Sequence, residues 1–411
     1  MKIFNRKLKI ISSALLTLCM VFVMTACAEN SSQPEKSQPA EQTTVQPTTM
    51  SAEEINDRKL DKFISDMTFE EKVGQMFFVR CPDEDAVKQV SEYNIGGYIL
   101  FGRDFDGKTK DEVVDDIHSY QNEADIPLLI GVDEEGGTVV RVSSNPNLRE
   151  TPFLSPKDTY ADGGWNAVKQ DAEEKADLLL SLGINVNLAP VCDMTSDEYG
   201  FMYDRSFSSD VDMENRYVRT VVETSKSKKL GTVLKHFPGY GNNSDTHTGI
   251  AYDDRDYSEF ENTDFKPFYQ GIESGADCIL VSHNIVNCMD SEYPASLSQK
   301  VHDILRNEFK FDGVIMTDDL IMDAITDFTG DEAAAVTAAK CGNDLLCCSS
   351  VDTQYPAVLK AVQNGEISED QVDASVKRIL KWKQNLGIFN IDTYQKKVKP
   401  TEPTDTVGSE E

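Results

Sequence analysis

Positive charge is scarce in this 411-residue sequence. It has 40 Lys and Arg residues against 71 Asp and Glu residues, so its formal net charge is −31. Nucleic acids and anionic lipid surfaces attract basic proteins and repel a surface this acidic. The composition therefore argues against nucleic-acid binding, and against attachment to a membrane by charge.

Paired cysteine motifs are also missing. The chain has nine Cys but no CxxC motif. Cys19 and Cys27 belong to the N-terminal segment, and the remaining odd number is scattered through the chain, which is no disulfide framework. Most of these cysteines lie in apolar runs typical of strands, where we expect them to act as small core residues.

A long apolar run occurs only at the N-terminus. Residues 10–24 follow four basic residues and are too few to span a bilayer, so residues 1–26 are predicted to be a signal peptide. The end of this run, Met-Thr-Ala-Cys27, resembles a lipobox, in which Cys27 is lipidated. An ordinary cleaved signal peptide is the alternative. The sequence thus predicts an extracytoplasmic protein anchored to the cell membrane through its N-terminal lipid alone.

Two segments have almost nothing to bury. Residues 27–50 are rich in Ser, Gln, Pro and Thr, and residues 395–411 have a similar composition with more acidic residues. We expect a disordered tether and a disordered tail. Residues 51–394 remain, a length that suits one large barrel or two small domains.

Eight short apolar runs alternate with longer amphipathic segments in this central part. The runs lie at 76–80, 96–101, 127–133, 184–190, 231–237, 276–282, 312–319 and 343–349. Continuous apolar runs are typical of strands buried on both faces. Eight β/α alternations predict an α/β fold, a single (β/α)8 TIM barrel. A doubly wound sheet is the alternative, but the glycine-rich turn that usually follows its first strand is missing.

Polar residues stand at the ends of several of these runs, where the active site of a barrel forms. They are Asp133, Asp193, Lys235, His236, Ser282, His283, Asp318 and Asp319. So many polar groups converging on one rim indicate a site.

Several catalytic classes lack their usual residues. His236, His283 and Asp318 could bind a metal, but barrel metal hydrolases usually add a His-x-His on an early strand, and run 76–80 has no His. The sequence has no GxSxG elbow for serine catalysis, and no Cys in an obvious electropositive turn. We therefore expect neither a metal nor an organic cofactor.

The stretch KHFPGYGNNSDTHTGI, which begins at Lys235, suits glycoside hydrolysis instead. A retaining glycosidase needs an ionised carboxylate and a second group that first donates a proton and then accepts one. Asp318 suits the first role, with Lys235 and Arg205 favouring its ionised form. Asp245 and His247 point the same way in an extended loop, so Asp245 could raise the pKa of the imidazole and make it an acid near neutral pH. A surface histidine in a polar loop is the alternative interpretation of His247.

The same stretch resembles the signature of glycoside hydrolase family 3. It is closest to the branch of bacterial β-N-acetylglucosaminidases that recycle or trim peptidoglycan. Other motifs agree in the same order along the chain, and the resemblance covers about residues 52–390. These motifs are GVDEEGG (131–137), INVNLAPVCDM (184–194), DRSF (204–207), GVIMTDDL (313–320) and SVKRILKWKQNLGIF (375–389).

The resemblance implies a role for each matching residue. Asp318 is the expected nucleophile, His247 the expected acid/base and Asp245 the residue that orients it. The residues expected to bind the carbohydrate substrate are Asp133, Arg141, Arg205, Lys235, His236 and His283.

The sequence also departs from the family pattern. Tyr240 stands where His is common, Thr138 where Arg is usual, and Ser208 and Ser209 follow DRSF in place of Gly. These changes leave the aglycone and the exact sugar open. The expected function is a monomeric retaining exo-β-N-acetylglucosaminidase acting on peptidoglycan fragments or chito-oligosaccharides. The alternatives are a β-glucosidase or other exo-glycosidase of the family, a non-catalytic sugar-binding lipoprotein, and transfer of the sugar to phosphate.

Overall fold

The computed structural model describes residues 50–241 and 249–396. The predicted signal peptide, the proposed lipidation site Cys27, and nearly all of the tether and the tail lie outside these ranges. Asp245 and His247 also lie outside the described residues. Within the two ranges, no helix is both long enough and apolar enough to cross a bilayer.

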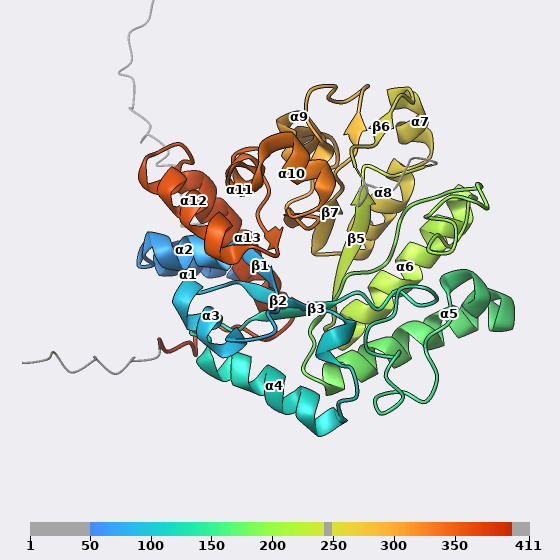
Figure 1. Cartoon of the computed structure of the whole chain (residues 1–411), viewed down its shortest axis with the longest axis horizontal. Coiled ribbons are helices and arrows are strands. Elements are labelled where there is room, and N and C mark those ends of the chain that lie inside the picture. Colours follow the sequence, from blue (N-terminus) through green and yellow to red (C-terminus); the bar gives the residue numbers. More distant parts are fainter. Residues whose placement is uncertain (1–49, 242–248, 397–411) are drawn as a thin grey trace, which may run out of the picture. The chain divides into compact units, whose positions relative to one another are not determined.

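Eight parallel strands form the central sheet, one for each predicted run (Figure 1). They are β1 (Phe77–Arg80), β2 (Gly97–Leu100), β3 (Leu129–Val132), β4 (Val186–Asn187), β5 (Gly231–Phe237), β7 (Cys278–Val281), β9 (Val314–Thr317) and β10 (Leu346–Cys348). Their order in the sheet is β10-β1-β2-β3-β4-β5-β7-β9, which follows the chain around a ring.

Backbone hydrogen bonds between the last two strands close this ring. The amide of Thr317 donates to the carbonyl of Leu345 at 3.1 Å, and the amide of Leu345 donates to the carbonyl of Ile315 at 3.1 Å. A parallel bridge joins Met316 to Leu345. The sheet is therefore a barrel rather than a doubly wound open sheet, and the (β/α)8 prediction is confirmed.

Helices surround the barrel (Figure 1). They are α1 (Ala52–Ser65), α2 (Phe69–Gln75), α3 (Ala86–Tyr93), α4 (Lys110–Glu123), α5 (Pro156–Ser181), α6 (Val211–Lys228), α7 (Tyr257–Asn262), α8 (Phe265–Ser274), α9 (Gln299–Asp303), α10 (Asp323–Thr329), α11 (Asp331–Lys340), α12 (Val351–Gln363) and α13 (Glu369–Asn385). Two short strands, β6 (Tyr252–Asp253) and β8 (Ile285–Val286), pair beside the barrel.

Local sequence determines where several helices begin. At α1, the Ser51 hydroxyl accepts from the amide of Glu54 at 3.1 Å, while the Glu54 carboxylate accepts from the amide of Ser51 at 2.7 Å. This reciprocal capping box satisfies two backbone donors that have no partner within the helix. The same box, with Thr and Glu, begins α2 and α4.

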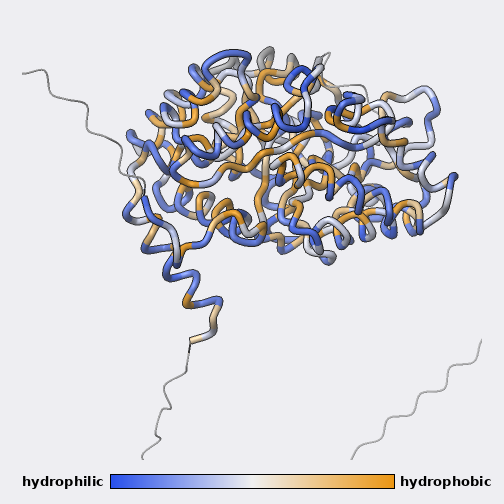
Figure 2. The backbone as a smooth tube through the Cα atoms, turned by 90° about the horizontal axis from the view of Figure 1, so that it is seen from below, coloured by the Kyte–Doolittle hydropathy of each residue, from blue (hydrophilic) through white to orange (hydrophobic). Residues whose placement is uncertain are grey.

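The barrel interior is filled by side chains, so the site can lie only at a barrel end. Phe78 of β1 is 1% exposed. It reaches across to β3, where a Cβ at Gly131 would lie 2.6 Å from its ring, so only glycine fits there. In Figure 2 the most hydrophobic segments run through the interior of the fold.

Candidate active site

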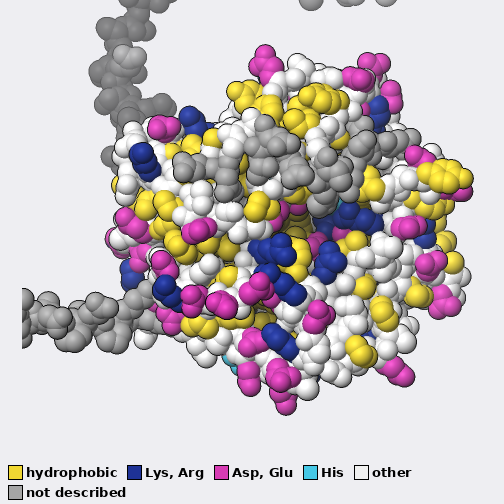
Figure 3. All heavy atoms as spheres, viewed as in Figure 1, with side chains coloured by type: hydrophobic (Ala, Val, Ile, Leu, Met, Phe, Trp, Pro, Cys, Tyr) yellow, Lys and Arg dark blue, Asp and Glu magenta, His cyan; other side chains and the backbone are white. Residues whose placement is uncertain are grey.

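A cavity of about 470 Å³ opens at the carboxyl ends of the strands. Six of the predicted site residues line it: Asp133, Arg141, Arg205, Lys235, His236 and Asp318. They come from β5, from the positions directly after β3 and β9, and from the loops that follow β3 and β4. The strand-end rule therefore identifies the correct end of the barrel. Figure 3 shows Lys and Arg side chains gathered around a hollow on one face of this otherwise acidic protein.

Strand β5 contributes two consecutive residues to the cavity. In a regular strand, neighbouring side chains point to opposite faces, yet Lys235 and His236 both line the cavity. The pairing of β5 with β7 shifts register between Leu234 and Phe237. Such an irregularity redirects a side chain, and here it brings an ammonium and an imidazole to the same surface.

Ion pairs link the strand ends on the cavity floor. The Lys235 ammonium lies 2.6 Å from an Asp133 carboxylate oxygen and 2.7 Å from a Glu135 carboxylate oxygen. Arg205 binds Glu135 with two donors, at 2.9 and 2.7 Å. Glu135 is 3% exposed. This buried carboxylate therefore holds two of the predicted sugar-binding cations in place.

Electrostatics keep Glu135 and Lys235 charged. Burial would raise the pKa of Glu135, but Lys235 and Arg205 outweigh it and hold that pKa well below its usual range. Burial would lower the pKa of Lys235, yet Asp133 and Glu135 outweigh it and the pKa is raised. The floor therefore offers fixed donors and acceptors of the kind that bind sugar hydroxyls.

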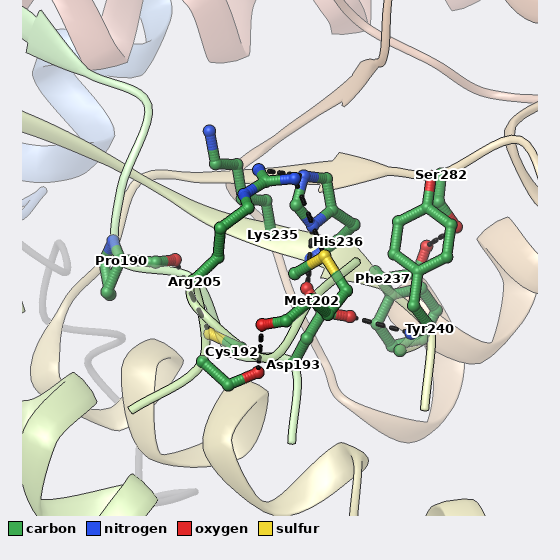
Figure 4. A network of polar contacts seen from close by, with 12 residues as sticks. Pro190, Cys192, Asp193, Met202, Arg205, Lys235, His236, Phe237, Tyr240 and Ser282 are labelled. Atoms are coloured by element: carbon green, nitrogen blue, oxygen red, sulfur yellow. Dashed lines mark hydrogen bonds and ion pairs between the residues drawn. The ribbon is translucent and has the colours of Figure 1, made fainter. Parts of the chain in front are cut away.

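A second carboxylate, Asp193, fixes the ring of His236 (Figure 4). One oxygen of Asp193 lies 2.7 Å from Nδ1 of His236 and accepts from the backbone amide of His236 at 2.9 Å. Nε2 lies 3.1 Å from a guanidinium nitrogen of Arg205. Because the guanidinium can only donate, Nε2 accepts and Nδ1 carries the proton. His236 is therefore held as the neutral Nδ1–H tautomer.

Asp318 follows β9 directly and lines the cavity. The backbone amide of Asp319 donates to its Oδ1 at 2.9 Å, and its own amide donates to the carbonyl of Val281 at 3.2 Å. The neighbouring Asp319 differs, because burial raises the pKa of its carboxyl group although the Ser349 hydroxyl opposes this. Both carboxyl groups line the cavity, and that of Asp319 also accepts from a backbone amide, that of Ile321, at 3.2 Å. The raised pKa makes the Asp319 carboxyl group the less suited of the two to act as an ionised nucleophile.

His283 is placed differently from the sequence expectation. It is fully buried and is not among the residues that line the cavity. Its Nε2 donates to the carbonyl of Asp319 at 3.0 Å, and its Nδ1 lies 2.7 Å from the Ser296 hydroxyl. The predicted sugar contact therefore does not fit this position. His283 instead supports the peptide that follows the predicted nucleophile.

Two charged cavity residues, Glu135 and Arg80, were missed from the predicted set. Glu135 lies two positions after Asp133 and so points the same way, a signal the sequence did contain. Arg80 ends β1 and lines the cavity with its guanidinium carbon 4.5 Å from the Phe101 ring centre. The rule that selected Asp133 also applies to Arg80. In the described ranges, no group of three or more His, Cys, Asp or Glu residues is arranged to hold a metal ion.

Comparison with known proteins identifies the family. The profile described as "Glycosyl hydrolase family 3 N terminal domain" matches residues 68–382. The chain belongs to glycosyl hydrolase family 3. A β-hexosaminidase from Nitrosomonas eutropha is 32% identical over 273 residues, which are 64% of this chain and 77% of that protein. The family resemblance and the prediction of a glycoside hydrolase are both confirmed.

Solved structures of this family agree. A glycoside hydrolase family 3 β-N-acetylglucosaminidase from Paenibacillus superposes with a TM-score of 0.74 and 29% identity, covering 84% of this chain and 66% of that chain. A family 3 member from Mycobacterium smegmatis has a TM-score of 0.71 and 26% identity, covering 78% of this chain and 98% of that chain.

Proposed function

We propose that the protein is a retaining exo-β-N-acetylglucosaminidase that releases terminal N-acetylglucosamine. The observation that carries this proposal is the charged floor formed by Asp133, Glu135, Lys235 and Arg205 beside Asp318 in one cavity. Because the barrel beneath the floor is filled, a substrate enters from one end only. That arrangement suits the terminal sugar of a chain. The relatives named above as a β-hexosaminidase and a β-N-acetylglucosaminidase support the choice of sugar.

The proposed reaction has two steps. The Asp318 carboxylate attacks the anomeric carbon and forms a glycosyl ester, while His247 donates a proton to the departing glycosidic oxygen. His247 then accepts a proton from water, the water oxygen attacks the same carbon, and Asp318 leaves as a carboxylate. Asp245 orients the imidazole. Two inversions give net retention of the β configuration.

Fixed groups on the floor lower the cost of this reaction. Lys235 and Asp133 are already paired, and Asp193 already orients His236, so these groups need little rearrangement when the sugar binds. Preorganised dipoles and charges stabilise developing charge better than mobile water does. Nε2 of His236 accepts from Arg205, so the imidazole and the guanidinium also hold each other in place beside the sugar site.

The nucleophile assignment is tested with Asp318→Ala and a 4-nitrophenyl N-acetylglucosaminide. We expect kcat to fall at least about a thousandfold, because removing a catalytic nucleophile usually causes a loss of this size. Asp312→Ala is the matched control, because Asp312 is exposed and precedes the same strand. Retained turnover in Asp318→Ala would refute the assignment.

The acid/base assignment needs substrates with different leaving groups. A good leaving group departs without a proton, so His247→Ala should slow cleavage of a poor leaving group far more than cleavage of a dinitrophenyl group. Equal losses on both substrates would show that His247 is not the acid. An NMR spectrum of the first product formed reports retention or inversion directly.

We also propose where the enzyme works. Lipidation of Cys27 would anchor a monomer outside the cell membrane, where it meets peptidoglycan fragments or chito-oligosaccharides. In a bacterial host, Cys27→Ala should move the enzyme from the membrane fraction to the soluble fraction without changing its kcat. An unchanged membrane fraction would contradict the lipid anchor and leave the activity proposal intact.

A further inference from the structure

Phe201 and Tyr240 are among the aromatic residues that line the cavity, and Tyr240 stands where the sequence departs from its family. We propose that Phe201 and Tyr240 form an aromatic wall for the aglycone, and that the wall selects aglycones with a pyranose ring. Phe201 contacts the aglycone, and Tyr240 positions Phe201. The inference rests on the proposed glycosidase function and adds which chemical class of leaving group the site prefers.

The wall is built separately from the two cores of the barrel. Tyr240, Met202 and Val191 form a small buried cluster of their own, and Phe201 packs on it from the cavity side. The two large hydrophobic clusters of the fold do not include these residues. A small apolar group beside a charged cavity has little to contribute to the core, and apolar walls with a few polar groups are typical of ligand sites.

The geometry gives the two rings different roles. Their centroids are 5.1 Å apart with an interplanar angle of 85°, an edge-to-face contact that aromatic pairs favour. Tyr240 is only 2% exposed, so its ring supports rather than binds. Phe201 is partly buried and lines the cavity. The ring of Phe201 is therefore the one available to a ligand.

The wall adjoins the predicted sugar site. The Tyr240 ring also packs against the His236 ring, with centroids 5.2 Å apart. The amide of Tyr240 donates to Oδ1 of Asp193 at 2.7 Å, while Oδ2 of the same carboxylate holds His236 (Figure 4). The aromatic wall thus stands next to the imidazole expected to bind the terminal sugar, and one carboxylate fixes both.

The chemistry of the wall indicates its ligand class. A pyranose ring has polar edges and an apolar C–H face, and that face can stack on an aromatic side chain. The floor supplies the polar groups for the terminal sugar, whereas Phe201 offers a flat apolar surface without charge. A simple alcohol as leaving group has no such face. The wall should therefore increase specificity for a sugar aglycone over a small alkyl aglycone.

The test compares kcat/KM on N,N′-diacetylchitobiose with kcat/KM on methyl β-N-acetylglucosaminide. In Phe201→Ala, we expect a loss of about 10- to 100-fold on the disaccharide, the size of one lost apolar contact, and less than about threefold on the methyl glycoside. Tyr199→Ala is the matched control, because Tyr199 lies in the same turn and is 97% exposed. It should behave like the unmodified enzyme on both substrates.

Variants of Tyr240 test its positioning role. Tyr240→Phe keeps the ring and should keep the selectivity for the disaccharide, whereas Tyr240→Ala should lose it in the same way as Phe201→Ala. Thermal unfolding of each variant shows whether the fold is retained. Selectivity that is lost in Tyr240→Ala and retained in Tyr240→Phe separates support of Phe201 from a general loss of structure.

Three results would overturn the inference. Equal losses on both substrates in Phe201→Ala would place the wall at the terminal sugar, and no loss on either substrate would show that the ring does not contact the ligand. An unmodified enzyme that cleaves neither substrate would refute the proposed function and the wall with it. An active unmodified enzyme with an unaffected Phe201→Ala variant would refute the wall alone.

Discussion

A buried lysine far along the chain provides the sharpest test of the electrostatic reasoning. Lys383 of α13 is fully buried, and its ammonium donates to the side-chain oxygen of Gln75 at 2.7 Å. Within the described residues, no carboxylate forms an ion pair with it. Burial alone lowers its pKa from the ordinary 10.5 to about 7. The folded protein therefore holds this proton weakly.

The sign of the effect on stability follows from this pKa. The unfolded chain binds the proton more tightly than the folded chain, so stability rises with pH between about 7 and 10.5. Below pH 7 the buried charge lowers the unfolding free energy by its full amount, and above pH 10.5 this loss of stability is absent. The fall in pKa corresponds to about 5 kcal/mol of unfolding free energy.

Lys383→Met removes this cost and keeps most of the stem volume. It also leaves the Gln75 oxygen without the donor it uses in the native protein, which costs about 1–3 kcal/mol. At pH 6 we therefore expect the variant to be more stable by about 2–4 kcal/mol. At pH 11, where the lysine is mostly neutral in both states, it should be less stable by about 1–3 kcal/mol.

Urea unfolding of the variant and the unmodified protein at both pH values measures this difference. Lys360→Met on α12 is the control, because Lys360 is exposed and its replacement should change stability little at either pH. A Lys383→Met variant that is destabilised equally at pH 6 and pH 11 would refute the reasoning, because the uncompensated charge would then carry no cost.

Two further predictions concern the candidate site. Glu135→Gln should lower the unfolding free energy by about 3–5 kcal/mol, because Lys235 and Arg205 would remain buried without their shared carboxylate; urea unfolding checks this, and a loss below about 1 kcal/mol would contradict it. His283→Leu should slow formation of the glycosyl enzyme by up to about a hundredfold, because it releases the Asp319 carbonyl beside the nucleophile. Rapid-mixing kinetics with a dinitrophenyl glycoside measure that step, and a change in KM alone would point to a sugar contact instead.

The sequence predicted the eight barrel strands and their order because buried parallel strands and amphipathic helices have distinct periods, but it did not predict the short pair β6 and β8. It predicted strand lengths less well. Run 184–190 yields only the two-residue strand Val186–Asn187. The reason lies in two polar side chains. Asn185 accepts from the amide of Ile130 at 2.9 Å, and Asn187 accepts from the amide of Glu134 at 3.0 Å. Side chains thus satisfy backbone donors that a regular ladder would otherwise use.

The prediction of the site succeeded for some residues and failed for others. Strand-end position is a property of the sequence, so it selected Asp133, Lys235 and Asp318 correctly as cavity residues. Strand-end position does not tell how deeply a side chain is buried or which group it hydrogen-bonds. His283 also follows a strand end, but its Nε2 donates to the carbonyl of Asp319, so the ring does not line the cavity. Glu135 was not predicted but lies on the cavity floor. Its role depends on Lys235 and Arg205, which come from two distant segments of the chain.

The contact between Asp193 and position 240 explains how the family pattern can change there without disturbing the floor. Asp193 accepts from the backbone amide of Tyr240, not from its side chain. Any residue except proline supplies that amide, so the carboxylate keeps its hold on His236 whatever side chain stands at 240. The side chain is constrained instead by its own neighbours, which include Phe201, the His236 ring, Val191 and Met202. The side chain at position 240 can therefore change with the aglycone that the enzyme prefers, while the groups that bind the terminal sugar stay in place.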